Sequence, residues 1–295
     1  MSLWPYLCLF TSGFCWGLGL PFGKMALAAT DPAHMILLRF LVAAAVAAPV
    51  TLRRPETRRL LRHPAALTAG LCYAIGFLVQ FEGLSRSSVT VTALLVGAMP
   101  ALIAVSAAVT GERVGPLAWL GVAGATLGAM LIAGKPGQAS VLGVFLCLVS
   151  LPVFLGWLFA TRRIPAGPVD AACVSVVLAA VILVPLVVGL HGLPRLDLGV
   201  TAWIGLVGQG ILSTVAATVC WQLGAPRVST AAAGVFINVE PLVGSALGLL
   251  AFHDRPTWIA ALGGVLILAG SLTVVLGERR TPGRAGAAED APTPA

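Results

Sequence analysis

The chain has 295 residues, of which 58% are hydrophobic and only 10% are charged. A soluble domain carries roughly a quarter charged residues, so this composition excludes a soluble globular fold and favours a protein embedded in a lipid bilayer. The net charge is +7, but the positive residues gather in short loops and near the C-terminus, without a basic groove that carries interleaved aromatic residues. The sequence therefore gives no indication of a nucleic-acid partner.

Ten apolar segments follow one another along the chain, each about 20 residues long, which is the length a helix needs to cross the hydrocarbon core. They cover residues 3–23, 34–52, 64–84, 88–109, 115–134, 140–161, 169–190, 199–222, 228–252 and 257–276. Their apolar runs are continuous rather than alternating, which favours helices over the strands of a barrel. We predict an all-α integral membrane protein with ten transmembrane helices, the first of which is retained rather than cleaved as a signal peptide.

The same five-helix pattern is written twice, about 141 residues apart, as is typical of duplicated membrane carriers. The corresponding residues are Trp16 and Trp157, Gly83 and Gly224, Arg86 and Arg227, Pro100 and Pro241, and, after one residue of slippage, Gly121 and Gly263, and Gly128 and Gly270. Because each copy crosses the membrane an odd number of times, the second copy is inverted relative to the first. We expect a first repeat over residues 1–134, a second over 135–280, and a disordered cytoplasmic tail over 281–295.

Positive charge in the loops predicts the orientation. The loop over residues 53–62 alone carries Arg53, Arg54, Arg58, Arg59 and Arg62. Cytoplasmic loops are enriched in Lys and Arg, so both termini are expected in the cytoplasm. The acidic and basic neighbours Glu112-Arg113 and Asp254-Arg255 follow spans four and nine, where we interpret them as loop caps and topology signals.

Cofactor and catalytic motifs are absent from the sequence. It has no phosphate-binding loop, no zinc-protease or serine-hydrolase motif, and its four histidines do not form a metal-ligand set. The six cysteines lie in apolar stretches without a C-x-x-C pattern, so we expect inert buried residues. An enzyme, a cofactor and a metal site are therefore not expected.

Span nine contains a polar pair near mid-membrane, Asn238 and Glu240, directly before Pro241. The first repeat has Gly97 and Met99 at the equivalent positions, so the polar pair belongs to one half only. An ionisable residue inside the bilayer is costly and is a functional candidate by default. We expect both side chains to face a central cavity, where Glu240 carries a proton or binds an ammonium group. The alternative is a neutral Glu240 that hydrogen-bonds a carbonyl freed by the proline.

Several other side chains are candidates for this cavity. Gln80 in span three and Gln209 in span eight are expected in its wall. Arg39 in span two could bind a substrate carboxylate, but we favour a side chain that reaches the interface.

Two pairs of equivalent residues complete the set of candidates. Trp16 and Trp157 lie inside their spans and are either cavity walls or packing residues, of which we favour packing. Pro100 and Pro241 each remove an intrahelical hydrogen bond near mid-depth, so we expect paired helix kinks that take part in rocking of the two halves.

The order of these residues resembles that of a known family. Gly83-Leu84, Val91, Ala93-Leu94 and Pro100 precede Gly-Glu-Arg at residues 111–113 and a glycine-rich helix, and residues 223–275 repeat this layout. With Trp16-Gly17, Lys24 and Arg39 before it, the layout resembles the EamA branch of the drug/metabolite transporter superfamily. The second copy departs from it, with His253-Asp254-Arg255 in place of Gly-Glu-Arg.

The resemblance implies a carrier of two inverted EamA domains in the bacterial inner membrane, often an exporter of amino acids or related small metabolites. We therefore predict a secondary transporter of a small polar or amphipathic solute, by alternating access, either coupled to protons or uncoupled. Its partners are this solute and the lipid bilayer, and the oligomeric state stays open between monomer and dimer. The alternatives are a flippase for lipids or lipid-linked sugars, and a membrane receptor or scaffold without flux.

Overall fold

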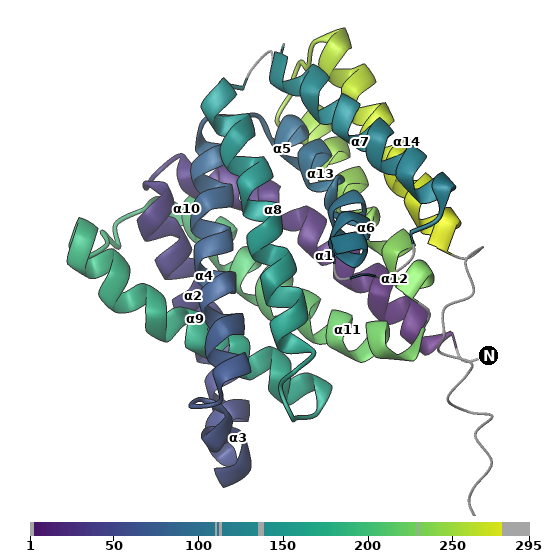
Figure 1. Cartoon of the computed structure of the whole chain (residues 1–295). Helices are drawn as coiled ribbons and strands as arrows, with labels where there is room; N and C mark the ends of the chain where they lie inside the picture. The colour runs from purple at the N-terminus through teal and green to yellow at the C-terminus, as the bar shows by residue number, and fades with distance from the viewer. Residues whose placement is uncertain (1–2, 110, 112–113, 135–138, 229, 279–295) are drawn as a thin grey trace, which may run out of the picture.

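The computed structural model describes residues 3–109, 111, 114–134, 139–228 and 230–278, and its regular elements are helices (Figure 1). The first half contains α1 (Trp4–Leu27), α2 (Pro32–Arg53), α3 (Pro55–Leu60), α4 (Pro64–Ser85), α5 (Val89–Val96), α6 (Met99–Val109) and α7 (Pro116–Gly134). The second half contains α8 (Val141–Thr161), α9 (Pro168–His191), α10 (Gly199–Gly208), the π-helix η1 (Gln209–Ala216), α11 (Ala217–Gly224), the 3-10 helix η2 (Ala225–Arg227), α12 (Thr230–Ile237), α13 (Val239–Ala251) and α14 (Trp258–Glu278).

The ten predicted spans are confirmed, with ends that differ by a few residues. Within the described residues, nine helical stretches are long and apolar enough to cross a membrane, and α7 adds the shorter apolar stretch Pro116–Ile132. The expected tail over residues 281–295 and the Glu112-Arg113 pair lie outside the described residues.

Local sequence explains where several helices begin. The Asp31 carboxylate caps α2 by accepting hydrogen bonds from the backbone N–H groups of Ala33 (3.0 Å) and His34 (3.1 Å). Ser88 and Ser140 cap α5 and α8 in the same way, since each hydroxyl accepts a hydrogen bond from the backbone N–H of the residue three positions later, Val91 and Gly143 respectively. Such caps satisfy N–H groups that the first helical turn leaves without a partner.

The fourth and ninth spans are each broken into two helices near their middle. The first break is at Gly97 and Ala98, between α5 and α6, and the second is at Asn238, between α12 and α13. Gly97 and Asn238 are equivalent in the repeat. Pro100 and Pro241 lie in the first turn of α6 and α13, where a missing N–H group costs little. Each copy therefore has a helix that restarts at mid-span.

The eighth span contains the π-helix η1, which the sequence did not predict. The Thr214 hydroxyl donates a hydrogen bond to the Gln209 carbonyl, five residues earlier, at 2.9 Å. A hydroxyl that hydrogen-bonds a carbonyl within its own helix competes with the regular backbone bonds. Widened turns of this kind are frequent at functional sites. The short arginine-rich helix α3 was also not predicted, since it lies in the loop between spans two and three.

The helices pack as two inverted copies require. The pairs α2–α9 and α7–α14 join equivalent helices. The contact of α5 with α13 has its symmetry-related counterpart in that of α12 with α6, and the packing of α4 on α8 matches that of α1 on η1 and α11. Figure 1 shows α7 and α14 side by side at one edge of the molecule. Along this pair Gly121 faces Gly270, and Gly128 faces Gly263. Exchanging the equivalent residues turns the first contact into the second, as an antiparallel two-fold arrangement predicts.

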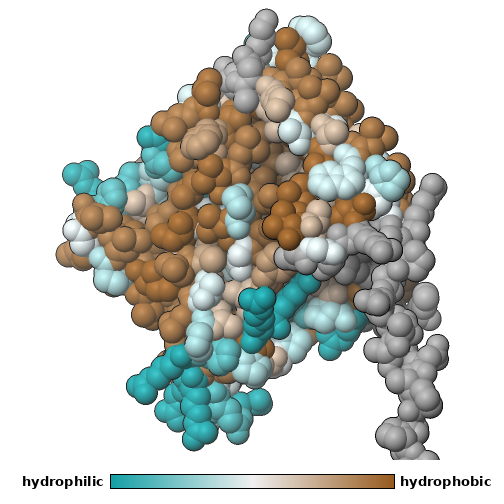
Figure 2. Space-filling view, viewed as in Figure 1, coloured by the Kyte–Doolittle hydropathy of each residue, from teal (hydrophilic) through white to brown (hydrophobic). Residues whose placement is uncertain are grey.

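The surface has the distribution of a membrane protein. In Figure 2 apolar residues cover most of the visible face, and hydrophilic residues gather at the end that carries α3. Large apolar side chains are exposed on several spans, for example Phe145 (59%) on α8 and Val181 (59%) on α9. Lipid accepts such side chains without penalty, so the exposed apolar face marks the lipid contact.

Candidate functional site

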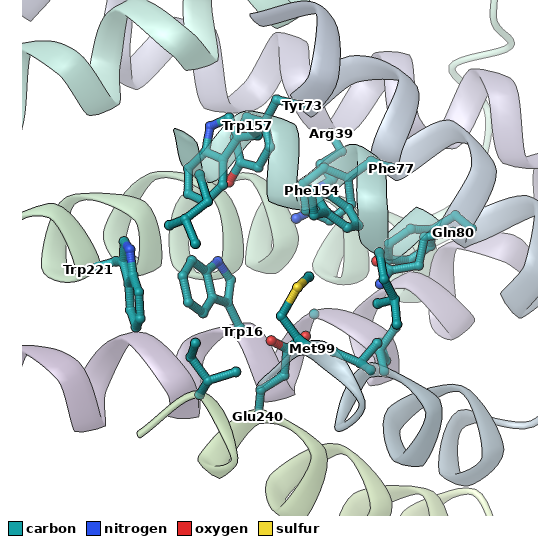
Figure 3. Close-up of a pocket in the computed structure, with 17 residues that line it drawn as sticks. Trp16, Arg39, Tyr73, Phe77, Gln80, Met99, Phe154, Trp157, Trp221 and Glu240 are labelled. Carbon is teal, nitrogen blue, oxygen red and sulfur yellow. The ribbon is translucent and has the colours of Figure 1, made fainter. Parts of the chain in front are cut away.

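A cavity of about 90 Å³ lies between the two halves. Its wall comes from α1, α2, α4, α5 and α6 of the first half and from α8, α11, α12 and α13 of the second. The wall is mostly aromatic and apolar, and includes Trp16, Tyr73, Phe77, Phe81, Phe154, Trp157 and Trp221. Arg39, Gln80 and Glu240 are its polar members (Figure 3).

Aromatic rings from both halves form one continuous part of this wall. The Trp16 and Trp157 rings, which are equivalent in the repeat, meet edge to face with centroids 6.3 Å apart. Trp157 stacks on Tyr73 at 4.8 Å, and Trp16 contacts Trp221 at 5.4 Å. The sequence favoured a packing role for both tryptophans. The structure places them in the cavity wall, where they also pack on one another.

Arg39 is buried inside the protein, with 1% of its surface exposed. Its Nε donates a hydrogen bond to the Thr214 hydroxyl at 2.7 Å, and its guanidinium carbon lies 3.8 Å from the centre of the Phe77 ring. The expectation that this side chain reaches the interface is therefore wrong. The face of α2 that carries Arg39 packs inward, where aromatic rings and a hydroxyl replace water as partners of the cation.

Glu240 lies in the first turn of α13, directly after the break at Asn238, and lines the cavity. Its position at a helix N-terminus stabilises a negative charge. The carboxylate is within electrostatic range of Arg39, yet no ion pair joins the two in the described part of the chain. Among the described residues no hydrogen bond to a freed backbone carbonyl is found for Glu240.

The three predicted amide residues lie in different surroundings. Gln80 lines the cavity. Gln209 packs against α1, where its Nε2 donates a hydrogen bond to the Gly19 carbonyl at 2.6 Å. Asn238 lies at the helix break, where its Nδ2 donates to the Gly234 carbonyl at 3.4 Å. Neither is in the cavity wall. Of the predicted Asn238 and Glu240 pair, the structure brings only Glu240 to the cavity.

Sequence reasoning missed several wall residues, although helical spacing carried a signal for some of them. Tyr73 and Phe77 precede Gln80 by seven and three residues, which places all three on one face of α4. Phe154 precedes Trp157 by three residues on α8 in the same manner. Residues three, four or seven positions from Gln80 or Trp157 lie on the same helix face, so helical spacing from these two residues would have identified the neighbours.

Polar contacts join the helices at one end of the molecule. The Lys24 ammonium donates to the carbonyls of Leu84 (3.1 Å) and Ser87 (2.7 Å) at the end of α4. The Asp254 carboxylate accepts a hydrogen bond from the N–H of Thr90 at 2.8 Å, at the start of α5. The structure thus confirms a capping role for Asp254, although the helix it caps belongs to the other half.

The arrangement of two halves around a shared cavity agrees with a comparison against known families. The model of the EamA-like transporter family matches this chain twice, over residues 3–134 and 138–276. The chain belongs to the EamA-like transporter family. Both matches together cover nearly all of the ten spans, and the boundary between them falls between α7 and α8.

A relative and a solved structure resemble this EamA-family chain over most of its length. The "Probable terminal-alkyne amino-acid exporter" of Streptantibioticus cattleyicolor is 28% identical over 291 residues, which cover 91% of this chain and 94% of the relative. A crystal structure of a protein with 22% sequence identity superposes with a TM-score of 0.66, over 94% of this chain and 99% of the other. The second likeness concerns the fold alone.

Proposed function

We propose that this EamA-family protein is a secondary transporter that exports small metabolites, such as amino acids or related amphipathic solutes, by alternating access. One observation carries the proposal: a cavity between two inverted halves, with aromatic walls and with Arg39 and Glu240 as oppositely charged members. Buried ionisable groups near the midplane mark solute pathways in transporters. The name of the Streptantibioticus relative supports an amino acid as the cargo and export as the direction.

The size of the cavity supports a small solute. Pockets for drug-sized ligands measure about 300–1,000 Å³, whereas this cavity measures about 90 Å³. A flippase for lipids or lipid-linked sugars needs a polar groove for a large head group, and the wall here is mainly aromatic. A receptor or scaffold without flux predicts a solid interior, which the cavity argues against.

The two helix breaks supply the moving parts of the proposed mechanism. Each half contributes one span that is broken into two helices, and both breaks lie beside the cavity. The cavity-lining residues on either side of the breaks are Val96 and Met99 in the first half, and Ile237 and Glu240 in the second. Rocking of one repeat, residues 1–134, against the other, residues 135–280, would expose the cavity to each side in turn. We place the protein in the bacterial inner membrane with both termini in the cytoplasm, on the arginine content of the loops.

Flux in proteoliposomes tests this function. Purified protein is reconstituted, and uptake of radiolabelled amino acids and fluorescent amphipathic dyes is measured with and without a pH gradient of either sign. The proposal predicts saturable, protein-dependent flux of at least one small solute. Absence of flux for the whole panel, with correctly folded protein, would contradict it. Dependence of the flux on the sign of the gradient separates proton-coupled from uncoupled transport.

A further inference from the structure

Arg39 is a buried cation with an unused donor. Its side chain lines the cavity, 1% of the residue is exposed, and its Nη1 atom is buried without a hydrogen-bond partner. Arginine keeps its charge in proteins, so this donor stays cationic. A buried charge without a partner is costly. No carboxylate in the described residues forms an ion pair with Arg39, so the cavity offers a strong site for a carboxylate that comes from outside.

The π-helix fixes the direction of this donor. The Thr214 hydroxyl donates its hydrogen to the Gln209 carbonyl (2.9 Å), so it can only accept the hydrogen bond from Arg39 Nε (2.7 Å). The Phe77 ring holds the flat face of the guanidinium at 3.8 Å. These two contacts use one edge and one face of the group, while the buried Nη1 keeps hydrogen-bonding capacity that no described residue uses. Thr214 is therefore a positioning residue that acts through Arg39.

Glu240 supplies the opposite charge across the same cavity. Figure 3 shows Glu240 and Arg39 at different sides of the cavity, with Trp16 and Met99 between them in this view. The two charges interact electrostatically without touching. A solute that carries both an anionic and a cationic group can bridge this gap and pair both buried charges. A plain amine leaves Arg39 unpaired, and a plain carboxylate leaves Glu240 unpaired.

We propose that the cavity selects a zwitterionic amino acid, whose carboxylate binds the guanidinium group of Arg39 and whose ammonium group binds Glu240, with an apolar side chain against the aromatic rings. This inference rests on the proposed transport function and names the solute class and the two charged contacts. Charge-assisted hydrogen bonds to a carboxylate are the strong ones, and arginine is the side chain best suited to them. The small cavity volume agrees with a solute of this size.

Binding of matched solutes tests the assignment. Leucine is compared with 3-methylbutylamine, which lacks the carboxylate, and with 4-methylpentanoate, which lacks the ammonium group. Phenylalanine, phenethylamine and 3-phenylpropanoate form a second set. Binding to the purified full chain is measured by tryptophan fluorescence, since Trp16, Trp157 and Trp221 line the cavity. Calorimetry provides a second readout. Binding is preferred to flux here because free amines cross lipid unaided.

The wild type should bind the amino acid of at least one set at least tenfold more tightly than either analogue. Arg39→Gln should remove the preference for the amino acid over the amine analogue. Glu240→Gln should remove the preference for the amino acid over the carboxylate analogue. Thr214→Val should reduce the amino-acid-to-amine ratio severalfold, while Thr214→Ser, which keeps the hydroxyl, should preserve it. Thr126→Val is the matched control, since its exposed hydroxyl donates to a carbonyl of its own helix, that of Val122.

Three outcomes would overturn the inference. In the first, the analogues bind as tightly as the amino acids. In the second, Arg39→Gln weakens the binding of all members of a set equally. In the third, no amino acid binds, while proteoliposomes transport another solute of the flux panel. In these cases the transport function still stands. Absence of flux for every solute of the panel would instead remove the proposed function, and the inference with it.

Discussion

At the scale of single residues, the environment of Arg39 shows how a cation is held at membrane depth. It lies over the Phe77 ring, and the rings of Phe81 and Phe40 lie 5.4 Å and 5.8 Å from its guanidinium carbon. One hydroxyl accepts from its Nε. Aromatic faces attract a cation by roughly 2 kcal/mol or more when water is excluded. The rings therefore replace part of the hydration that the bilayer removes.

Replacing Phe77 with leucine should test this contact. Leucine keeps the apolar volume but removes the ring face, so Arg39 should lose its fixed orientation. We expect an increase in the solute concentration for half-maximal flux of about tenfold, which corresponds to about 1.4 kcal/mol. Concentration-dependent flux in proteoliposomes measures it. Phe14→Leu, at an exposed ring on α1, is the control, and an equal effect of both changes would refute the role of the ring.

The sequence could not reveal the position of Arg39, and the reason is physical. Almost every face of α2 is apolar, so the sequence does not show which face packs inward. A long side chain at this depth can also reach the interface in principle. The position of the Arg39 side chain depends on its contacts with Phe77 and Thr214, which lie 38 and 175 residues further along the chain. Gln209 and Asn238 were misplaced for the same reason, since helix rotation is a tertiary property.

At the scale of elements, the spans and their duplication could be predicted, while their irregularities could not. Apolar length alone gave ten spans, and repeated glycines and prolines gave the two copies. The breaks at Gly97 and Asn238 were anticipated only as kinks at the prolines that follow. The π-helix depends on a side-chain bond between Thr214 and Gln209 and on its contact with α2, so no local pattern predicts it.

Restoring a backbone donor at the second break should impair movement rather than binding. Pro241→Ala supplies an N–H group that can bond the Ile237 carbonyl, which favours one continuous helix over α12 and α13. We expect the maximal flux to fall severalfold with little change in the binding constant. Flux and binding are measured on the same preparation. Pro185→Ala, in the exposed part of α9, serves as the control, and a Pro241→Ala protein with wild-type maximal flux would contradict a hinge at this position.

The contact between α7 and α14 depends on glycine. A Cβ atom at Gly128 would lie 2.9 Å from Ile267 Cγ1, and one at Gly121 would lie 2.7 Å from the Val274 nitrogen. Lipid offers no hydrophobic drive for helix association, so close approach of backbones supplies the attraction. Gly128→Val should therefore lower the melting temperature in detergent, since overpacking costs about 1–3 kcal/mol.

Gly124→Ala provides the matched control on the same helix. A Cβ atom at Gly124 would meet its nearest neighbour at 3.7 Å, an ordinary contact distance. Its melting temperature should stay close to that of the wild type. Equal melting temperatures for the Gly128→Val and Gly124→Ala proteins would show that this interface does not require glycine at position 128.

At the scale of the whole molecule, polar contacts of Lys24 and Asp254 hold helices together at one end, and that of Asp254 joins the two halves. Asp254 belongs to the second half and caps α5 of the first, while Lys24 bonds the carbonyls at the end of α4. Alternating access requires that a contact between the halves, such as that of Asp254 with Thr90, breaks when this end opens, and the Lys24 contacts hold the neighbouring turn in place. They are therefore expected to set how often the cavity opens toward this side.

Removing the charge of Lys24 should loosen this end. Lys24→Met deletes two hydrogen bonds to the turn after α4, so we expect faster amide hydrogen exchange over residues 84–90. Lys24→Arg keeps a cationic donor and should leave exchange near the wild-type rate. Unchanged exchange in Lys24→Met would mean that other contacts hold this end.

Blocking the cavity tests the central claim most directly, namely that solute crosses the membrane through the space between the two inverted halves. Met99→Trp replaces a cavity-wall side chain by the larger indole ring, whereas Met130→Trp makes the same change at an exposed position of α7. We predict that saturable flux in proteoliposomes is lost in Met99→Trp and kept in Met130→Trp, with both proteins folded. Wild-type flux in Met99→Trp would contradict transport through this cavity.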